Sequence, residues 1–352
     1  MPLGLQTASL NFETLKEIGQ AGKNSRVYIA NDKQLESQIV IKQIKKDSLT
    51  YEGDYYKEAK ILYNHEHSNV AKVNYGCEDD EHVYIAMPYY RRGSLKDIID
   101  KRFLTNRETI RYAIQFLSGL NHIHSNRLMH FDIKPDNIFI TDSNEAVLAD
   151  FGLAKAMNIY DTAAQYFVYS KQQPPEVFTG DDYTYAFDIY LAGLTLYKMC
   201  NGLDSFELQY AVYGEDTDSY VKAVLKGEFP SREKYSWHIP NGLRKVINRA
   251  LSPDQADRYQ TALQLINALG AIDEMMDWKY AVITNVHVWS LDLDDKVITI
   301  KLSNNGQHYS VLTEKFIKKS GNTTKISDHC NANIISKKDV KKIVIAALKA
   351  LS

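Results

Sequence analysis

Cysteine and long apolar runs are both scarce in this 352-residue chain. The three cysteines, Cys77, Cys200 and Cys330, lie far apart at spacings that fit neither a metal site nor a disulfide framework, so we expect structural thiols in a reducing compartment. The longest apolar stretch, residues 187–200, is shorter than the roughly 18 residues of a membrane span, and Lys198 interrupts it. It predicts a buried helix. We find no export or lipidation signal, and we expect a cytoplasmic protein without a membrane partner.

A dominant charge of one sign is also lacking. Lysine and arginine number 42 against 44 acidic residues, so no overall field attracts nucleic acid or membrane. The balance is uneven, however, because residues 275–352 contain twelve lysines, no arginine and seven acidic residues, a local charge of +5. This asymmetry predicts a separate C-terminal module.

Hydrophobic periodicity divides the remainder into two parts. Residues 12–45 alternate apolar and polar positions around a turn-rich segment, and residues 82–87 repeat this pattern, which predicts antiparallel strands. Residues 55–63 predict one helix among them. Beyond residue 94 the apolar period is that of helices, in segments 95–100, 109–124, 187–200, 243–251 and 261–272.

Polar side chains of three kinds gather in one loop. Asp132, Lys134 and Asn137 lie within six positions, between the helix that ends near His124 and the apolar residues that follow. A second carboxylate, Asp150, comes after another short apolar segment. We therefore expect two loops that face one site.

The motifs in this region resemble the eukaryotic-type (Hanks-type) serine/threonine protein kinase family. HFDIKPDN, residues 130–137, is similar to the catalytic loop H-R-D-x-x-x-x-N, and the metal loop D-F-G begins at Asp150. PPE, DIYLAG and a late arginine follow in the family's order, at Glu176, Asp188 and Arg258. The resemblance implies a Glu176–Arg258 ion pair, and an Asp188 side chain that accepts backbone N–H groups of the catalytic loop.

The resemblance covers residues 12–270 and implies an α+β, bilobal protein kinase fold. The expected division is a β-rich N-lobe at 1–88, a helical C-lobe at 89–274 and the C-terminal module at 275–352. Three strands and one helix, a βββα unit, are predicted for the module, with an Asn304–Asn305–Gly306 turn and a Ser336 N-cap.

The resemblance also implies the cofactors and their ligands. ATP and Mg²⁺ are expected, with Mn²⁺ as an alternative metal. Asp132 would orient the substrate hydroxyl and Lys134 would neutralise the transferred phosphoryl group, while Asn137 and Asp150 would bind metal. Lys42 would hold the ATP phosphates, paired with a glutamate.

Two glutamates compete for that last role, and Glu58 matches the family pattern better than Glu52. The adenine slot would be formed by hinge and sheet residues, namely Ile18, Val27, Val40, Met87, Pro88, Tyr90 and Phe139. Val40 and Phe139 are larger than the alanine and leucine usual in the family, which predicts weaker ATP binding.

Two further departures concern phosphate groups. The glycine-rich loop keeps Gly19 and Gly22 but is one residue longer than usual and has Ser25 in place of its last glycine, so we expect a reshaped grip on the nucleotide. Phe131 replaces the arginine that binds an activation-loop phosphate in many relatives. Activity independent of activation-loop phosphorylation is therefore expected.

The favoured function is a non-RD serine/threonine kinase that acts on protein hydroxyls. A pseudokinase scaffold and a small-molecule kinase are the alternatives, and the four chemical groups Lys42, Asp132, Asn137 and Asp150 argue against the scaffold. For the module, a solvated basic surface is preferred over a nucleic-acid or acidic partner, because aromatic residues do not alternate with its lysines. The sequence does not indicate the protein substrate, the activating signal or the oligomeric state.

Overall fold

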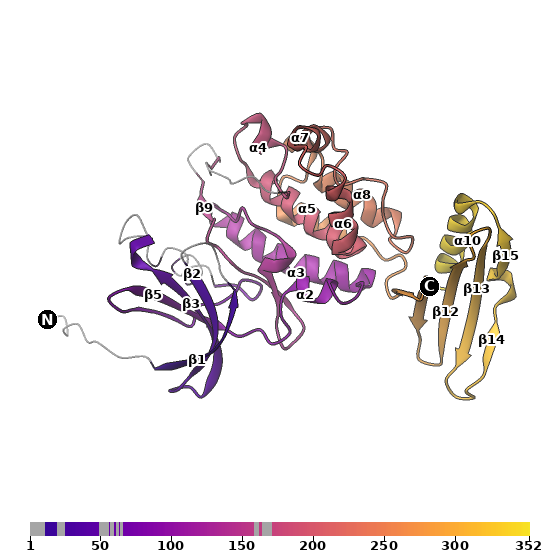
Figure 1. Cartoon of the computed structure of the whole chain (residues 1–352), viewed down its shortest axis with the longest axis horizontal. Coiled ribbons are helices and arrows are strands. Elements are labelled where there is room, and N and C mark those ends of the chain that lie inside the picture. The colour runs from indigo at the N-terminus through magenta and orange to yellow at the C-terminus, as the bar shows by residue number, and fades with distance from the viewer. Residues whose placement is uncertain are drawn as a thin grey trace.

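The structure is a computed structural model that describes residues 11–19, 25–48, 56, 60, 63, 66–157, 162–163 and 171–352. An antiparallel sheet lies at the N-terminal end, helices follow, and a second sheet covered by one helix lies at the C-terminal end (Figure 1). Within the described part of the chain, no helix combines the length and the apolarity that crossing a bilayer requires.

The N-lobe sheet has the strand order β1-β2-β3-β5-β4. Its strands are β1 (Phe12–Gly19), β2 (Ser25–Asp32), β3 (Ser37–Lys45), β4 (Tyr75–Glu78) and β5 (His82–Pro88), with a short 3-10 helix at Lys46–Ser48. Alternate residues of β2, β3 and β5 are buried, as period-two sequences require. The predicted strands are confirmed, whereas most of the helix predicted at 55–63 lies outside the described residues.

Helices form the C-lobe. They are α2 (Leu95–Ile99), α3 (Asn106–Ser125), α4 (Glu176–Thr179), α5 (Tyr185–Asn201), α6 (Leu203–Ala211), α7 (Thr217–Leu225), α8 (Asn241–Ala250) and α9 (Ala262–Gly270). Thr105 and Glu108 form a capping box that fixes the start of α3. Nearly every residue of α5 is buried, which confirms the core helix predicted from its apolar run.

Two short strand pairs support the loops between the lobes. β6 (Leu128–Met129) pairs with β9 (Lys155–Ala156), and β7 (Ile138–Ile140) pairs with β8 (Ala146–Leu148). A 3-10 helix at Pro135–Asn137 leads directly into β7. The strands therefore bring the segment around residue 132 and the segment around residue 150 close together.

The C-terminal module has more strands than the sequence predicted. Its sheet contains β10 (Lys279–Ile283), β11 (Val286–Asp292), β12 (Lys296–Asn304), β13 (Tyr309–Ile317), β14 (Thr323–Lys325) and β15 (Asn331–Ile334), with a 3-10 helix at Ser327–His329 and α10 (Lys337–Ala350). The βββα prediction is confirmed in part: β12, β13 and α10 are as predicted, but the first predicted strand is a hairpin of β10 and β11, and β14 and β15 were not predicted. Thr284 and Asn285 both have positive φ, the backbone form that tight two-residue hairpin turns need.

Other features of the module are as predicted. Gly306, with φ of 94°, lies in the turn between β12 and β13, and the Ser336 side chain caps α10 by accepting the Asp339 N–H. Val340 and Val344 are fully buried on the face of α10 that packs on the sheet.

Aromatic contacts join the module to the C-lobe. Trp237, in the loop before α8, stacks on Trp289 of β11 with 6.2 Å between the ring centroids. The Trp289 indole N–H donates to Nδ1 of His238 over 3.4 Å, and burial lowers the pKa of His238 to about 3, so this imidazole is neutral and can accept. The buried Asn106 amide donates to the Met275 carbonyl. An exposed Arg107–Asp277 ion pair lies at the edge of this contact.

Candidate active site

A buried carboxylate on α5 holds the loop that carries the candidate catalytic residues. Asp188 is fully buried and accepts the backbone N–H groups of His130 and Phe131, each over 2.8 Å. The imidazole of His124 lies 2.9 Å from the same carboxylate. Burial would raise the pKa of Asp188, but the hydrogen bond to His124, the nearby histidines and the backbone donor hold it below its usual value. The scaffold role predicted for Asp188 is confirmed.

Asp132, Lys134 and Asn137 meet at one point of this loop. The Lys134 ammonium lies 2.9 and 2.7 Å from the two carboxylate oxygens of Asp132. The Asn137 amide N–H₂ donates to the Asp132 carbonyl and to its carboxylate, each over 2.8 Å. Within the described residues, the amide oxygen of Asn137 has no hydrogen bond. It is therefore available as a ligand for a cation.

The second loop is tied to the first through the backbone. The Ala149 N–H donates to the Asn137 carbonyl over 2.9 Å, and the ring of His130 lies 3.1 Å from the Ala149 carbonyl. Asp150 follows with φ of 61°, a left-handed conformation that is unusual for a residue with a side chain. Functional sites often hold residues in such strained positions.

Asp150 also meets the N-lobe. Nζ of Lys42 lies 3.6 Å from Oδ1 of Asp150. Burial raises the pKa of the Asp150 carboxyl, but the charges of Lys42 and His130 outweigh this effect, and the pKa lies below its usual value. Asp150 is therefore ionised at neutral pH and suited to bind a hard cation.

Strand register brings the predicted adenine-slot residues of the sheet together. On β3, Lys42 lies opposite Val27 of β2 and Val40 lies opposite Met87 of β5. Because Val40 and Lys42 are two residues apart, their side chains share one face of the sheet. Gly19 pairs with Val27, so the end of β1 lies beside the same residues.

The other residues predicted for the adenine slot come from the hinge and the C-lobe. The ring of Phe139, on β7, stacks on Tyr90 with 5.6 Å between centroids. Pro88 ends β5. Proline lacks a backbone N–H but keeps its carbonyl, which is the group that the predicted hinge contact would use. Ile18, on β1, is 46% exposed. Gly22, Glu58 and the competing Glu52 lie outside the described residues.

A buried ion pair fixes the end of the activation segment, the stretch of chain from Asp150 to Glu176. The guanidinium of Arg258 donates to both carboxylate oxygens of Glu176 over 2.8 and 2.7 Å, and both side chains are essentially unexposed. Its remaining N–H groups bond backbone carbonyls of Ser252, Pro253 and Ala186. The predicted Glu176–Arg258 pair is confirmed, and every guanidinium donor is satisfied.

The side chain of Phe131 is buried and does not face solvent. It is 3% exposed, and its ring makes edge contacts with Phe187 and Tyr183 at 5.0 and 6.0 Å between centroids. Tyr183 in turn accepts a backbone hydrogen bond from Ala163 of the activation segment. An apolar cluster therefore occupies the position beside the catalytic loop where the resemblance predicts an arginine.

Sequence reasoning missed two residues near this site. His124, to which sequence reasoning assigned no role, is a direct partner of Asp188. Lys198 of α5 is buried, donates to the side-chain oxygen of Gln172 over 2.8 Å and lies 4.3 Å above the Phe206 ring. A charged residue inside an apolar run was the available signal for Lys198.

Comparisons with known proteins agree with this geometry. Residues 12–269 match the family described as protein kinase domain. The chain is 31% identical over 274 residues to the probable serine/threonine-protein kinase CPE1738 of Clostridium perfringens. This alignment covers 74% of this chain and 38% of that protein. It is 28% identical over 260 residues to the serine/threonine-protein kinase PrkC of Bacillus subtilis, with 71% and 39% covered.

A third relative is the calcium-dependent protein kinase 3 of Plasmodium yoelii yoelii, 31% identical over 246 residues, with 67% of this chain and 44% of that protein covered. The chain thus spans about two fifths of the length of these relatives. The matched region includes both loops, the Lys42 strand and the Glu176–Arg258 pair. The chain therefore belongs to the protein kinase family, of the eukaryotic-type serine/threonine branch.

Proposed function

We propose that this protein is an ATP-dependent serine/threonine kinase that transfers a phosphoryl group to protein hydroxyls. The observation that carries the proposal is the meeting of Asp132, Lys134 and Asn137 in one loop, which is tied by the backbone to Asp150. Phosphoryl transfer needs an orienting carboxylate, cations and hard metal ligands around one phosphorus. These residues supply all three.

Each residue has a proposed role. Asp132 would orient the substrate hydroxyl and take its proton. Lys134, now paired with Asp132, would turn to the transferred group and neutralise its charge. Lys42 would contact the ATP phosphates, with Glu58 as its partner.

The metal ligands proposed are Asn137 and Asp150. Their fit rests on two observations, the uncommitted amide oxygen of Asn137 and the lowered pKa of Asp150. Oxygen ligands of this kind suit Mg²⁺ and also Mn²⁺. When bound, the metal would neutralise phosphate charge.

The adenine base would lie between Ile18, Val27 and Val40 on one side and Phe139 on the other. Met87, Pro88 and Tyr90 would line the hinge, and Gly19 and Gly22 the phosphate loop. We also propose the division into an N-lobe at 1–88, a C-lobe at 89–274 and a module at 275–352.

Activation without activation-loop phosphorylation is a further part of the proposal. Phe131 offers no positive charge to a phosphate, and its packing on Phe187 and Tyr183 supports the loop by apolar contact instead. Purified protein treated with a phosphatase should keep its activity. Loss of activity after that treatment would contradict this part.

Transfer itself is tested with γ-labelled ATP, Mg²⁺ and a generic serine/threonine acceptor. The wild-type chain should label itself or the acceptor, and Asp132→Asn should abolish the label. Asp136→Asn is the matched control, since Asp136 is an exposed acid of the same loop, and it should retain labelling. No label from wild-type protein that still binds ATP would favour the scaffold alternative.

A further inference from the structure

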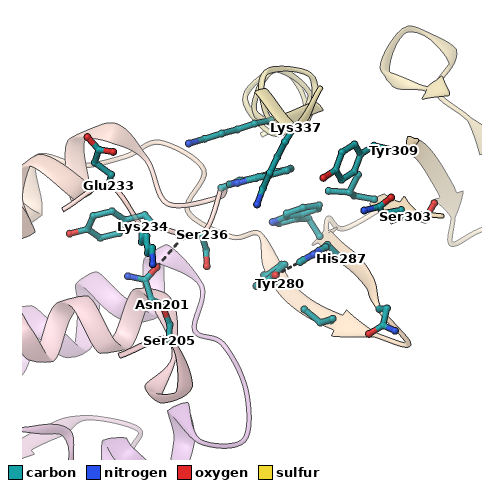
Figure 2. A pocket seen from close by; sticks show the side chains of 18 residues that line it. Asn201, Ser205, Glu233, Lys234, Ser236, Tyr280, His287, Ser303, Tyr309 and Lys337 are labelled. Atoms are coloured by element: carbon teal, nitrogen blue, oxygen red, sulfur yellow. Dashed lines mark hydrogen bonds between the residues drawn. The ribbon is translucent and has the colours of Figure 1, made fainter. Parts of the chain in front are cut away.

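A cleft lies between the C-lobe and the C-terminal module, far along the chain from the kinase loops (Figure 2). Its volume is about 780 Å³. The C-lobe contributes the loop around Trp237 together with Asn201 and Ser205, and the module contributes residues of β10 to β13 and of α10. Neither part of the protein forms this cleft alone.

Aromatic rings with nearly parallel planes form one wall of the cleft, in which Trp289 is only 2% exposed, so that Tyr280, His287 and Trp237 supply the accessible ring surface. Tyr280 and Trp289 are cross-strand partners, and their ring centroids are 5.3 Å apart with planes 29° apart. His287, two residues before Trp289 on the same face of β11, lies 18° from its plane, and Trp237 lies 11° from it. The Tyr280 hydroxyl and Nδ1 of His287 are 2.6 Å apart, which fixes the two rings relative to each other.

Two lysines of α10 line the cleft beside the rings. Lys337 and Lys341 are four residues apart and so lie on one face of the helix. Among the described residues neither makes an ion pair, whereas Lys301, Lys318 and Lys349 of the same module each pair with a carboxylate. Glu233 is the single acidic residue among those that line the cleft, so the lining is net positive.

The protonation of His287 depends on the nearby lysine charge. Partial burial and the positive charge of Lys337 lower the pKa of His287. The imidazole is therefore neutral near pH 7 and presents a flat ring next to a cation. It does not add a positive charge to those of Lys234, Lys337 and Lys341.

We propose that this cleft binds a nucleoside phosphate, with the base against the aromatic wall and the phosphate between Lys337 and Lys341. Flat rings in parallel planes suit a planar base of any sequence, and lysines suit phosphate as point charges. The hydroxyl groups of Ser205 and Ser303 and the amide group of Asn304 also line the cleft and can bond a ribose or a base edge. A phosphorylated serine or threonine peptide would use the lysines but carries no planar base to lie against the exposed rings.

The ligand chemistry is the same whether the nucleotide is free or part of a single RNA strand. This site is separate from the proposed ATP site, and the inference does not depend on phosphoryl transfer.

Tryptophan fluorescence gives a direct readout. The chain has three tryptophans, Trp237, Trp278 and Trp289, and all three lie at this junction or in the module core. Nucleotide bound between the kinase lobes meets none of them in the described part of the chain. Full-length protein would be titrated with adenosine monophosphate, with a short oligoadenylate and with a phosphoserine peptide in separate arms.

The expected result is a saturable fluorescence change with adenosine monophosphate or oligoadenylate, and the tighter of the two identifies the source. Lys337→Ala with Lys341→Ala should weaken binding by about tenfold or more, because charge-assisted bonds to the phosphate are lost. The matched control is Lys338→Ala with Lys342→Ala, which removes the same charge from the same helix outside the cleft and should leave affinity unchanged.

Three outcomes would overturn the proposal. No saturable change with either nucleotide probe would remove the site. Equal weakening in both double variants would show attraction to the module's overall charge instead of binding in the cleft. A response to the phosphoserine peptide alone would assign the cleft to phosphorylated protein.

Discussion

Asp132, Lys134 and Asn137 lie within six residues of one another, whereas the rings and lysines of the cleft are spread from Trp237 to Lys341. The kinase loop is fixed by a buried charge: the Asp188 carboxylate accepts the backbone N–H groups of His130 and Phe131. The cleft is held by neutral aromatic contacts, and within the described part of the chain Lys337 and Lys341 make no ion pair. The first arrangement fixes side chains in place, and the second leaves charge available for a ligand.

The largest loss in the free energy of unfolding should occur when a buried charge in the kinase lobes loses its partner. Glu176→Ala leaves the fully buried Arg258 guanidinium uncompensated, and we expect a loss of about 3–5 kcal/mol in the free energy of unfolding, measured by urea denaturation. Glu176→Ala combined with Arg258→Met should recover part of this loss. A loss under about 1 kcal/mol for the single variant would show that the pair is not an important support.

Lys198 is a buried lysine near the kinase loop, whereas Lys337 and Lys341 line the cleft. Burial lowers the pKa of Lys198 to about 8 in the folded protein. The unfolded chain, with a lysine pKa near 10.4, therefore binds more protons between about pH 8 and pH 10, so the free energy of unfolding should rise with pH across this window, by up to about 3 kcal/mol.

Lys198→Met isolates this effect from other groups that titrate in the same range. The difference between wild-type and variant stability, from urea curves at several pH values, should change only within that window. A pH-independent difference would contradict the lowered pKa. Lys337→Met should show no such change, since Lys337 is exposed.

A smaller effect is expected in the proposed adenine slot. Val40→Ala with Phe139→Leu enlarges the slot and should tighten ATP binding by about fivefold, equivalent to roughly 1 kcal/mol of relieved crowding. Calorimetric titration of each protein with ATP and Mg²⁺ would measure it. Lys337→Ala with Lys341→Ala should leave this affinity unchanged, and an unchanged dissociation constant in the slot variant would show that the larger residues do not hinder ATP.

The two regions also differ in how much of them the sequence predicted. The kinase loop residues were predicted because their chemistry is contiguous in sequence. Five C-lobe helices, α2, α3, α5, α8 and α9, were predicted from their apolar period, whereas α4, α6 and α7 were not predicted. The hairpin at Thr284 and Asn285 was missed because neither residue is a glycine. The cleft was missed because its rings lie on β10, β11 and a C-lobe loop while its lysines lie on α10, so no stretch of sequence alternates the two kinds of residue.

The smallest effect is expected where charges join the module to the C-lobe. Arg107 and Asp277 form a bidentate pair, but each side chain is more than half exposed. Arg107→Ala should therefore lower the free energy of unfolding by less than about 1 kcal/mol, and added salt should shrink the difference further. Urea denaturation at low and high salt would test this. A loss above about 2 kcal/mol would show that ionic contacts, and not the Trp237–Trp289 stack, hold the module in place.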